Sequence, residues 1–142
     1  MRVNRFVLDN NIWISYFITN NHHRVIDIIN QYEIAIFSCD ELVEEFMTVL
    51  KYKHLLKYKV NISKAVKLLS EVTTHFTLTY PLKNYIPEDE DDNCIIALAL
   101  QTNSGFVTSG DNHILSQKKK LEAKYSRLKI INKAEFEEMF PL

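Results

Sequence analysis

The sequence predicts a three-layer α/β/α sandwich around a mostly parallel, five-stranded sheet. Short apolar runs that end at polar residues alternate with longer amphipathic segments along the chain. Strands that alternate with helices are joined by helical crossovers, so their sheet is mostly parallel and covered on both faces. The 142 residues, 46% of them hydrophobic and 25% charged, are enough for a single globular domain that spans 1–142.

Five apolar runs are predicted to form the strands. The short run that ends at Leu8 is apolar and stops at Asp9, as expected of a buried strand. The run at 76–80 alternates apolar and polar residues, which is the period of a half-buried strand. The strands are expected at 5–8, 33–38, 76–80, 105–109 and 128–131.

Helices are predicted between these strands, where apolar residues recur at helical spacing. Between 40 and 50, apolar residues follow one another at intervals of three and four and therefore share one face. The helices are expected at 12–18, 22–31, 40–50, 62–74 and 91–102, with a lysine-rich helical segment at 52–59 and a short terminal helix that Asn132 caps. A polar loop is expected between the last two strands.

Carboxylates gather where the predicted strands end. Asp9 directly follows the first strand, and Asp111 lies just past the fourth. A run of five acidic residues, 88–92, contains no basic residue and leads into the helix at 91–102. In parallel sheets, ligands bind beyond the carboxyl ends of the strands, where the strand order reverses. Carboxylates at the edge of a core need a compensating cation, so this pattern predicts a divalent metal.

The helix at 40–50 offers three glutamates for the same site. Each residue of an α-helix advances the direction of its side chain by about 100°. By that rotation, Glu45 lies about 100° from the centre of the apolar stripe, Glu41 about 140° and Glu44 about 160°. Glu45 is therefore the glutamate that lies most nearly beside the core.

Helical periodicity leaves the choice open within the acidic run. It does not separate Asp91 from Asp92, because residues 95–100 are apolar on all sides. Residues 88–90 are predicted to cap the helix and to complement its dipole. The five histidines are predicted to be surface or packing residues, and His113 is the exception to watch because it follows Asp111 by two positions.

The net charge of −1 hides a separation of acidic and basic segments. Lysines cluster with tyrosines at 51–67, and a second basic cluster lies at 118–129. Acidic and basic regions in one chain suit a protein that holds a metal and binds a phosphate backbone. The alternative is that the lysines simply cover helix surfaces.

The remaining composition predicts a cytoplasmic protein that makes no membrane contact. No apolar run approaches the roughly 20 residues of a membrane span. The N-terminus also lacks the apolar region of a signal peptide. Cys39 and Cys94 sit beside apolar residues without metal-type spacing, which predicts buried, reduced thiols.

Four segments, in this order along the chain, resemble the motifs of the PIN-domain ribonucleases. They are 7–15, with an asparagine two residues after Asp9; the glutamate segment 41–50; the acidic segment 89–99; and 107–111, which ends in Ser-Gly-Asp. The resemblance covers essentially the whole chain and is greatest to the bacterial toxins of toxin–antitoxin pairs. It implies a PIN-like sheet with strand order 3-2-1-4-5.

The resemblance also implies a set of site residues. The family's acidic positions fall on Asp9, Glu45, Asp92 and Asp111, as catalytic residues and as ligands of Mg²⁺ or Mn²⁺. The alignment to the alanines at 97 and 99 selects Asp92 over Asp91. Asn11 and Ser109 take the positions that orient the carboxylates or contact phosphate. Whether one or two ions bind stays open.

The sequence thus predicts a Mg²⁺- or Mn²⁺-dependent endoribonuclease, the toxin of a toxin–antitoxin pair. Its predicted partners are an RNA substrate, a cognate antitoxin protein and further copies of itself in a homodimer or higher homo-oligomer. Lys53 and Lys57 are predicted to contact the RNA backbone. The alternative is a weakly active or inactive PIN-like protein whose acidic cleft binds a basic partner.

Overall fold

The computed structural model describes residues 4–86 and 90–142. Residues 88 and 89 of the predicted cap and the side chains of Glu90 and Asp91 fall outside what it describes. Within the described ranges, no helix has the length and apolar character needed to cross a membrane.

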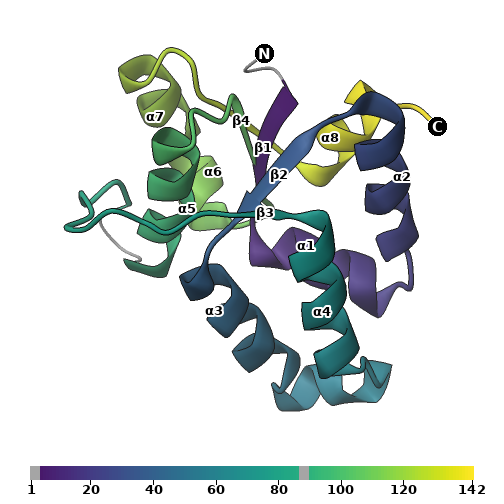
Figure 1. The fold of residues 1–142 in the computed structure, drawn as a ribbon. Coiled ribbons are helices and arrows are strands. Elements are labelled where there is room, and N and C mark those ends of the chain that lie inside the picture. Colours follow the sequence, from purple (N-terminus) through teal and green to yellow (C-terminus); the bar gives the residue numbers. More distant parts are fainter. Residues whose placement is uncertain (1–3, 87–89) are drawn as a thin grey trace.

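Five parallel strands form one sheet in the order β3-β2-β1-β4-β5, which confirms both the predicted fold class and the implied strand order. Strands β2 and β3 lie on one side of β1, each next to the strand before it. Strands β4 and β5 lie on the other side of β1 (Figure 1). The strand order therefore reverses between β1 and β4. The strands span Arg5–Leu8 (β1), Ala35–Ser38 (β2), Thr74–His75 (β3), Phe106–Thr108 (β4) and Lys129–Ile131 (β5).

Helices cover both faces of this sheet (Figure 1). Helices α5, α6 and α7 lie on one side, whereas α1, α2 and α8 lie on the other, and α3 and α4 extend beyond the sheet. The helices span Asn10–Ile18 (α1), His22–Tyr32 (α2), Asp40–Leu50 (α3), Ile62–Val72 (α4), Glu90–Gln101 (α5), Asn112–Ser116 (α6), Lys118–Lys124 (α7) and Lys133–Met139 (α8), with a 3₁₀ segment η2 at Lys53–Tyr58.

Alternate side chains of β1 enter two separate cores. Phe6 and Leu8 pack with α1, α2 and α8 in one cluster, and Val7 packs with α5 in the other. All three side chains are fully buried. A strand that is buried on both faces has no need of polar alternation, which explains the uniformly apolar sequence before Asp9.

The strand predicted at 76–80 is wrong, because the observed β3 is the two-residue pair Thr74–His75. Its neighbour β2 ends at Ser38, whose carbonyl accepts a final bond from the Phe76 amide at 2.8 Å. Beyond that point Gln101 of α5 replaces the strand partner. Its side chain accepts from the Thr79 amide at 2.7 Å and donates to the Thr79 carbonyl at 3.0 Å.

The polar loop predicted between the last two strands is also wrong, because it contains α6 and α7. Ile114 and Leu121, seven residues apart, are both buried in the cluster beside α5. Their spacing corresponds to two helical turns, so each short helix buries one anchor. The basic side chains around them conceal this pattern in the sequence.

Burial raises the pKa of the Cys39 thiol to about 12. A thiol with a raised pKa in the folded state stabilises the fold below its unfolded pKa, and this contribution is lost as pH rises toward the folded value. We therefore expect Cys39, alone in a Cys94→Ser variant, to react with a thiol reagent near pH 8 only after unfolding in urea. The urea midpoint of this variant should fall as pH rises above about 9.

The matched control is Cys39→Ala, which keeps the half-buried Cys94. Its thiol should react in the folded protein. Equal labelling rates for folded and unfolded Cys94→Ser protein would contradict the burial of Cys39.

Candidate metal centre

Asp9 is fixed at the carboxyl end of β1 by its backbone and its side chain. Its amide donates to the Thr108 carbonyl of β4 at 2.9 Å, which continues the pairing of the two strands. Its carboxylate caps α1 by accepting from the Asn10 amide at 2.7 Å. The side chain of Asn10 is itself buried and donates to the Leu42 carbonyl of α3 at 2.9 Å. Asp9 is only 5% exposed, so its carboxylate has a defined position.

The buried hydroxyl of Ser109 joins two of the predicted acids. It donates to the second carboxylate oxygen of Asp9 at 2.8 Å and accepts from the Asp111 amide at 3.0 Å. Asn11 contributes in another way, since its side-chain oxygen accepts from the Gly110 amide at 3.3 Å. Ser109 thus contacts a carboxylate, whereas Asn11 holds the backbone of the loop after β4.

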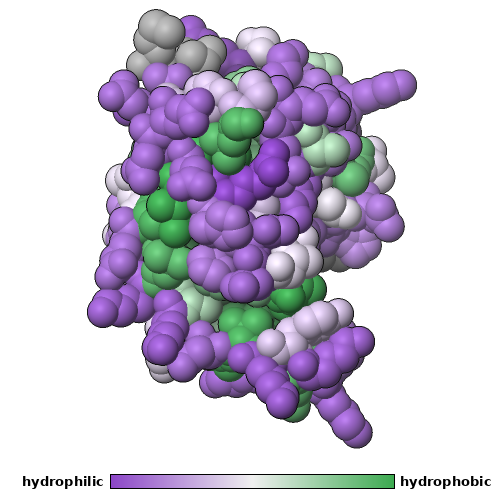
Figure 2. Space-filling model, turned by 90° about the vertical axis from the view of Figure 1, so that its right-hand side faces the viewer, coloured by the Kyte–Doolittle hydropathy of each residue, from purple (hydrophilic) through white to green (hydrophobic). Residues whose placement is uncertain are grey.

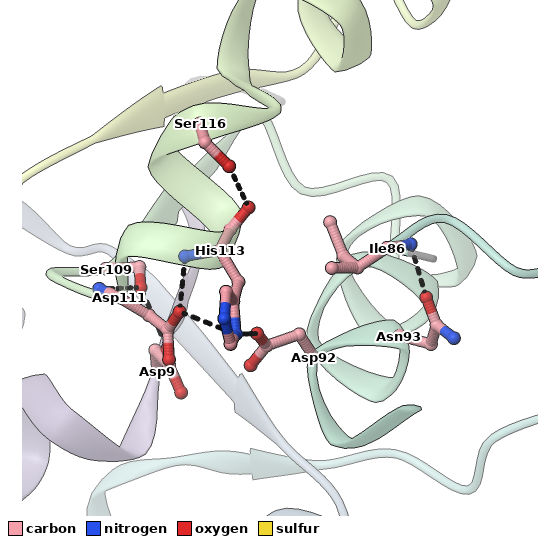
Figure 3. A network of polar contacts seen from close by, with 8 residues as sticks. All are labelled: Asp9, Ile86, Asp92, Asn93, Ser109, Asp111, His113 and Ser116. Atoms are coloured by element: carbon pink, nitrogen blue, oxygen red, sulfur yellow. Dashed lines mark hydrogen bonds and ion pairs between the residues drawn. The ribbon is translucent and has the colours of Figure 1, made fainter. Parts of the chain in front are cut away.

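Asp111 and His113 lie together at the start of α6 (Figure 3). Asp111 caps this helix by accepting from the His113 amide at 2.7 Å. The His113 Nδ1 atom lies 3.8 Å from a carboxylate oxygen of Asp111 and 3.9 Å from one of Asp92. The histidine side chain is half exposed, so it stands at the entrance of the cluster.

Asp92 reaches the cluster from the first turn of α5, on the opposite side from α6 (Figure 3). It is 6% exposed. Its neighbour Asn93 points the other way and accepts from the Ile86 amide at 2.6 Å, and it also donates to Asn84 at 3.1 Å. Asn93 thereby attaches the segment that contains Asn84 and Ile86 to one side of α5, while Asp92 lies on the other side.

The donor set fits a divalent cation. One ligand atom each from Asp92, Asp111 and His113 lie within 4.8 Å of one another. Carboxylate oxygens suit Mg²⁺ and Mn²⁺, and an imidazole nitrogen suits transition metals. The Ser109 hydroxyl is hydrogen-bonded to both the Asp9 carboxylate and the Asp111 amide. The Asp9 carboxylate is therefore a further acidic group beside this cluster.

His113 is the site residue that the sequence motifs do not include. Its position two residues after Asp111 is the only signal for it in the sequence. A residue at that spacing enters the first turn of the helix that Asp111 caps, and its ring then turns back toward the carboxylates.

The acids of α3 divide between two environments. Asp40 pairs with His75 of β3 at 2.8 Å, and Glu41 accepts a hydrogen bond from the Tyr80 hydroxyl in the segment after β3. Glu45 is half-buried one turn further along. Among the described residues it does not join the three ligand atoms that lie within 4.8 Å of one another, and its role as a ligand stays a prediction.

Lys53 and Lys57 are exposed on η2, at the end of the arm that α3 and α4 form. The Lys57 ammonium group lies 5.2 Å from the centre of the Tyr58 ring. Tyr52, which precedes this segment, and Leu56 within it are 48% and 58% exposed. Figure 2 shows hydrophobic residues reaching the surface among hydrophilic ones toward this end of the molecule.

Residues 5–113 match the family model described as the PIN domain. The chain belongs to the PIN domain family. This match includes Asp9, Asp92 and Asp111, together with His113 at its last position. Family membership supports a nuclease, that is, a hydrolase of phosphodiester bonds.

Other known proteins are similar to this chain in sequence or in structure. An uncharacterized protein of Methanocaldococcus jannaschii is 27% identical over 142 aligned positions, which cover 96% of this chain and 91% of that protein. The crystal structure of VapBC2 from Rickettsia felis, bound to a promoter DNA fragment, has a TM-score of 0.55 at 12% identity and covers 90% of this chain and 98% of that one.

Two further solved structures share the fold. VapC20 of Mycobacterium tuberculosis, a toxin that cleaves the sarcin-ricin loop, gives a TM-score of 0.54 at 11% identity, with 78% of this chain and 94% of that one covered. VapBC-1 of nontypeable Haemophilus influenzae gives a TM-score of 0.52 at 16% identity, with 90% of this chain and 97% of that one covered. At these identities the likeness establishes the fold.

We expect Ser109→Ala to destabilise the protein by about 1–3 kcal/mol, because it removes hydrogen bonds of a buried hydroxyl and leaves Asp9 with one donor fewer. The measurement is urea unfolding. Ser116→Ala is the matched control, because the Ser116 hydroxyl is exposed and donates to the His113 carbonyl at 2.9 Å. Equal, small losses in both variants would contradict the proposed bridging role of Ser109.

Proposed function

We propose that this protein is a Mg²⁺- or Mn²⁺-dependent endoribonuclease that acts in the cytoplasm as the toxin of a toxin–antitoxin pair. One observation carries the proposal. Asp9, Asp92 and Asp111, from three distant parts of the sequence, meet where the strand order reverses. Clustered carboxylates without a cation would repel a phosphodiester, so the arrangement has a use in hydrolysis chiefly with a bound metal.

Asp92 and Asp111 would hold the ion, with Asp9 and Glu45 as further carboxylates and His113 at the entrance. When bound, the ion would activate a water molecule and stabilise the charge on the leaving oxygen. Ser109 keeps the Asp9 carboxylate oriented, and Asn11 keeps the loop after β4 in place. Contacts of this kind around the ligands hold them in the geometry that the metal requires.

RNA as the substrate is supported by the exposed lysines of η2 and by the similarity to VapC20, whose name describes cleavage of the sarcin-ricin loop. An antitoxin as the partner is supported by the two similar VapBC structures and by the exposed hydrophobic residues of η2. Further copies of this chain remain proposed partners.

We expect Asp92→Asn and Asp9→Asn each to reduce Mn²⁺-dependent RNA cleavage by at least about 100-fold, which corresponds to about 3 kcal/mol in the activation barrier. Replacing a charged ligand by a neutral amide weakens metal binding while the side chain keeps its shape. Cleavage is measured on total RNA with mapped ends, and thermal unfolding should show that both variants are folded at the assay temperature.

Asp40→Asn serves as the control, since Asp40 is exposed and pairs with His75. It should keep wild-type activity. Full activity of both Asp92→Asn and Asp9→Asn would exclude the acidic cluster as the catalytic centre. Absence of Mn²⁺ binding at millimolar concentration, without any partner, would favour the alternative of an inactive protein whose acidic cleft binds a basic partner.

We expect replacement of Lys53 and Lys57 by alanine to weaken RNA binding and to lower its salt dependence. Each lost phosphate contact on a single strand reduces the slope of log affinity against log salt by about 0.7, so the double variant should lose about 1.4. The binding assay uses the Asp92→Asn background to prevent cleavage. Lys119→Ala with Lys120→Ala is the control, and an unchanged slope for Lys53 and Lys57 would identify them as ordinary surface lysines.

A further inference from the structure

A cavity of about 620 Å³ lies where β4 and β5 begin, at the opposite end of the strands from the acidic cluster. It is lined by residues from 99–106, where α5 ends and β4 begins, and from 124–129, where α7 ends and β5 begins. Small-molecule sites in proteins measure about 300–1,000 Å³, so this cavity has the size of a ligand site.

The charged residues of this cavity are all basic among those that the structure describes. Lys124, Arg127 and Lys129 line it, and no described lining residue is acidic. Glu122 of α7 is not part of the lining, and its carboxylate accepts a hydrogen bond from the Ile130 amide at 2.9 Å. Three cations without a carboxylate among them favour an anionic ligand, and an arginine can bind phosphate oxygens with two parallel hydrogen bonds.

The other walls of the cavity are apolar and aromatic. Leu100, Phe106 and Leu128 contribute to them, together with Tyr125. The Tyr125 hydroxyl is buried and finds no hydrogen-bond partner among the described residues. Aromatic and aliphatic walls beside cations suit a molecule with a planar apolar group on one side and a phosphate on the other.

Hydrogen bonds hold the rim of the cavity in place, and those described next leave the side chains of Lys124, Arg127 and Lys129 unused. The Arg5 guanidinium donates to the Thr102 carbonyl at 2.7 Å, and the hydroxyls of Thr102 and Ser104 lie 2.7 Å apart. The Gly105 amide donates to the Arg5 carbonyl at 3.1 Å, and its carbonyl accepts from the Lys129 amide at 2.9 Å. The backbone of a site held in this way needs little ordering when a ligand binds.

We propose that this cavity binds a nucleoside phosphate, with the base against the aromatic wall and the phosphate on Lys124, Arg127 and Lys129. The site goes beyond the proposed catalytic function and is separate from its residues. The segment 124–129 also lies beyond residues 5–113, which match the PIN family model. A free nucleotide and one nucleotide of an RNA strand share this chemistry.

Calorimetric titration with AMP tests the proposal, with EDTA present so that the acidic cluster holds no metal. The wild-type protein is compared with the double variant Lys124→Gln and Arg127→Gln. Its matched control is Lys119→Gln with Lys120→Gln, which removes the same charge from parts of α7 outside the cavity. We expect the cavity variant to lose at least about tenfold in affinity and the control to stay within about twofold.

A third variant tests the cavity without changing its charge. Ser126 is exposed at the cavity, and Ser126→Trp should fill part of the space and weaken AMP binding. Equal losses of affinity in the cavity variant and in its Lys119 and Lys120 control would overturn the proposal, because they would indicate general charge attraction. Absence of binding by both AMP and an oligonucleotide at millimolar concentration would also overturn it.

Two further titrations identify the part of the ligand that is recognised and its source. Inorganic phosphate should bind at least about tenfold more weakly than AMP, and equal affinity would overturn the role of the aromatic wall. A single-stranded pentanucleotide that binds where AMP does not, with the same loss in the cavity variant, supports an RNA strand as the source. Binding of AMP supports a free nucleotide. RNA cleavage assays with Mn²⁺ are independent of these results.

Discussion

The parallel pairing of β1 with β4 is the constraint on which the rest of this structure depends. The register sets Leu8 opposite Thr108, so the next residues along each strand, Asp9 and Ser109, come into contact at the carboxyl edge. Ser109 then fixes the start of the loop that carries Asp111 and His113. A register shift by one residue would exchange the two faces of β1 and separate these side chains.

The fold was predictable from the sequence because its cores depend on patterns that repeat locally. The apolar run before Asp9 in β1, the stripe of α3 and the apolar run in α5 each indicate their element without knowledge of the partner. The acids at strand ends were predictable for the same reason, since Asp9 and Asp111 immediately follow apolar runs. The order of the strands was predicted from the family resemblance, because hydrophobic periodicity alone does not determine strand order.

Other features were not predictable because they depend on contacts between distant residues. The short β3 results from the end of β2 and from Gln101, which binds the Thr79 backbone in place of a strand. Helices α6 and α7 each depend on one buried apolar residue, Ile114 and Leu121, that is surrounded by polar and basic residues in the sequence. The approach of His113 to Asp92 is a distance across the sheet edge, and no local pattern encodes it.

The bond between Ser109 and Asp9 joins residues that are 100 positions apart. During synthesis, Asp9, α1 and the arm of α3 and α4 all leave the ribosome well before the strand that completes the acidic cluster. Contacts of such sequence separation form late in folding, since a long loop must be closed first. The acidic cluster is therefore one of the last parts of the molecule to form, and a nascent or truncated chain that lacks β4 also lacks the contact that joins its two halves.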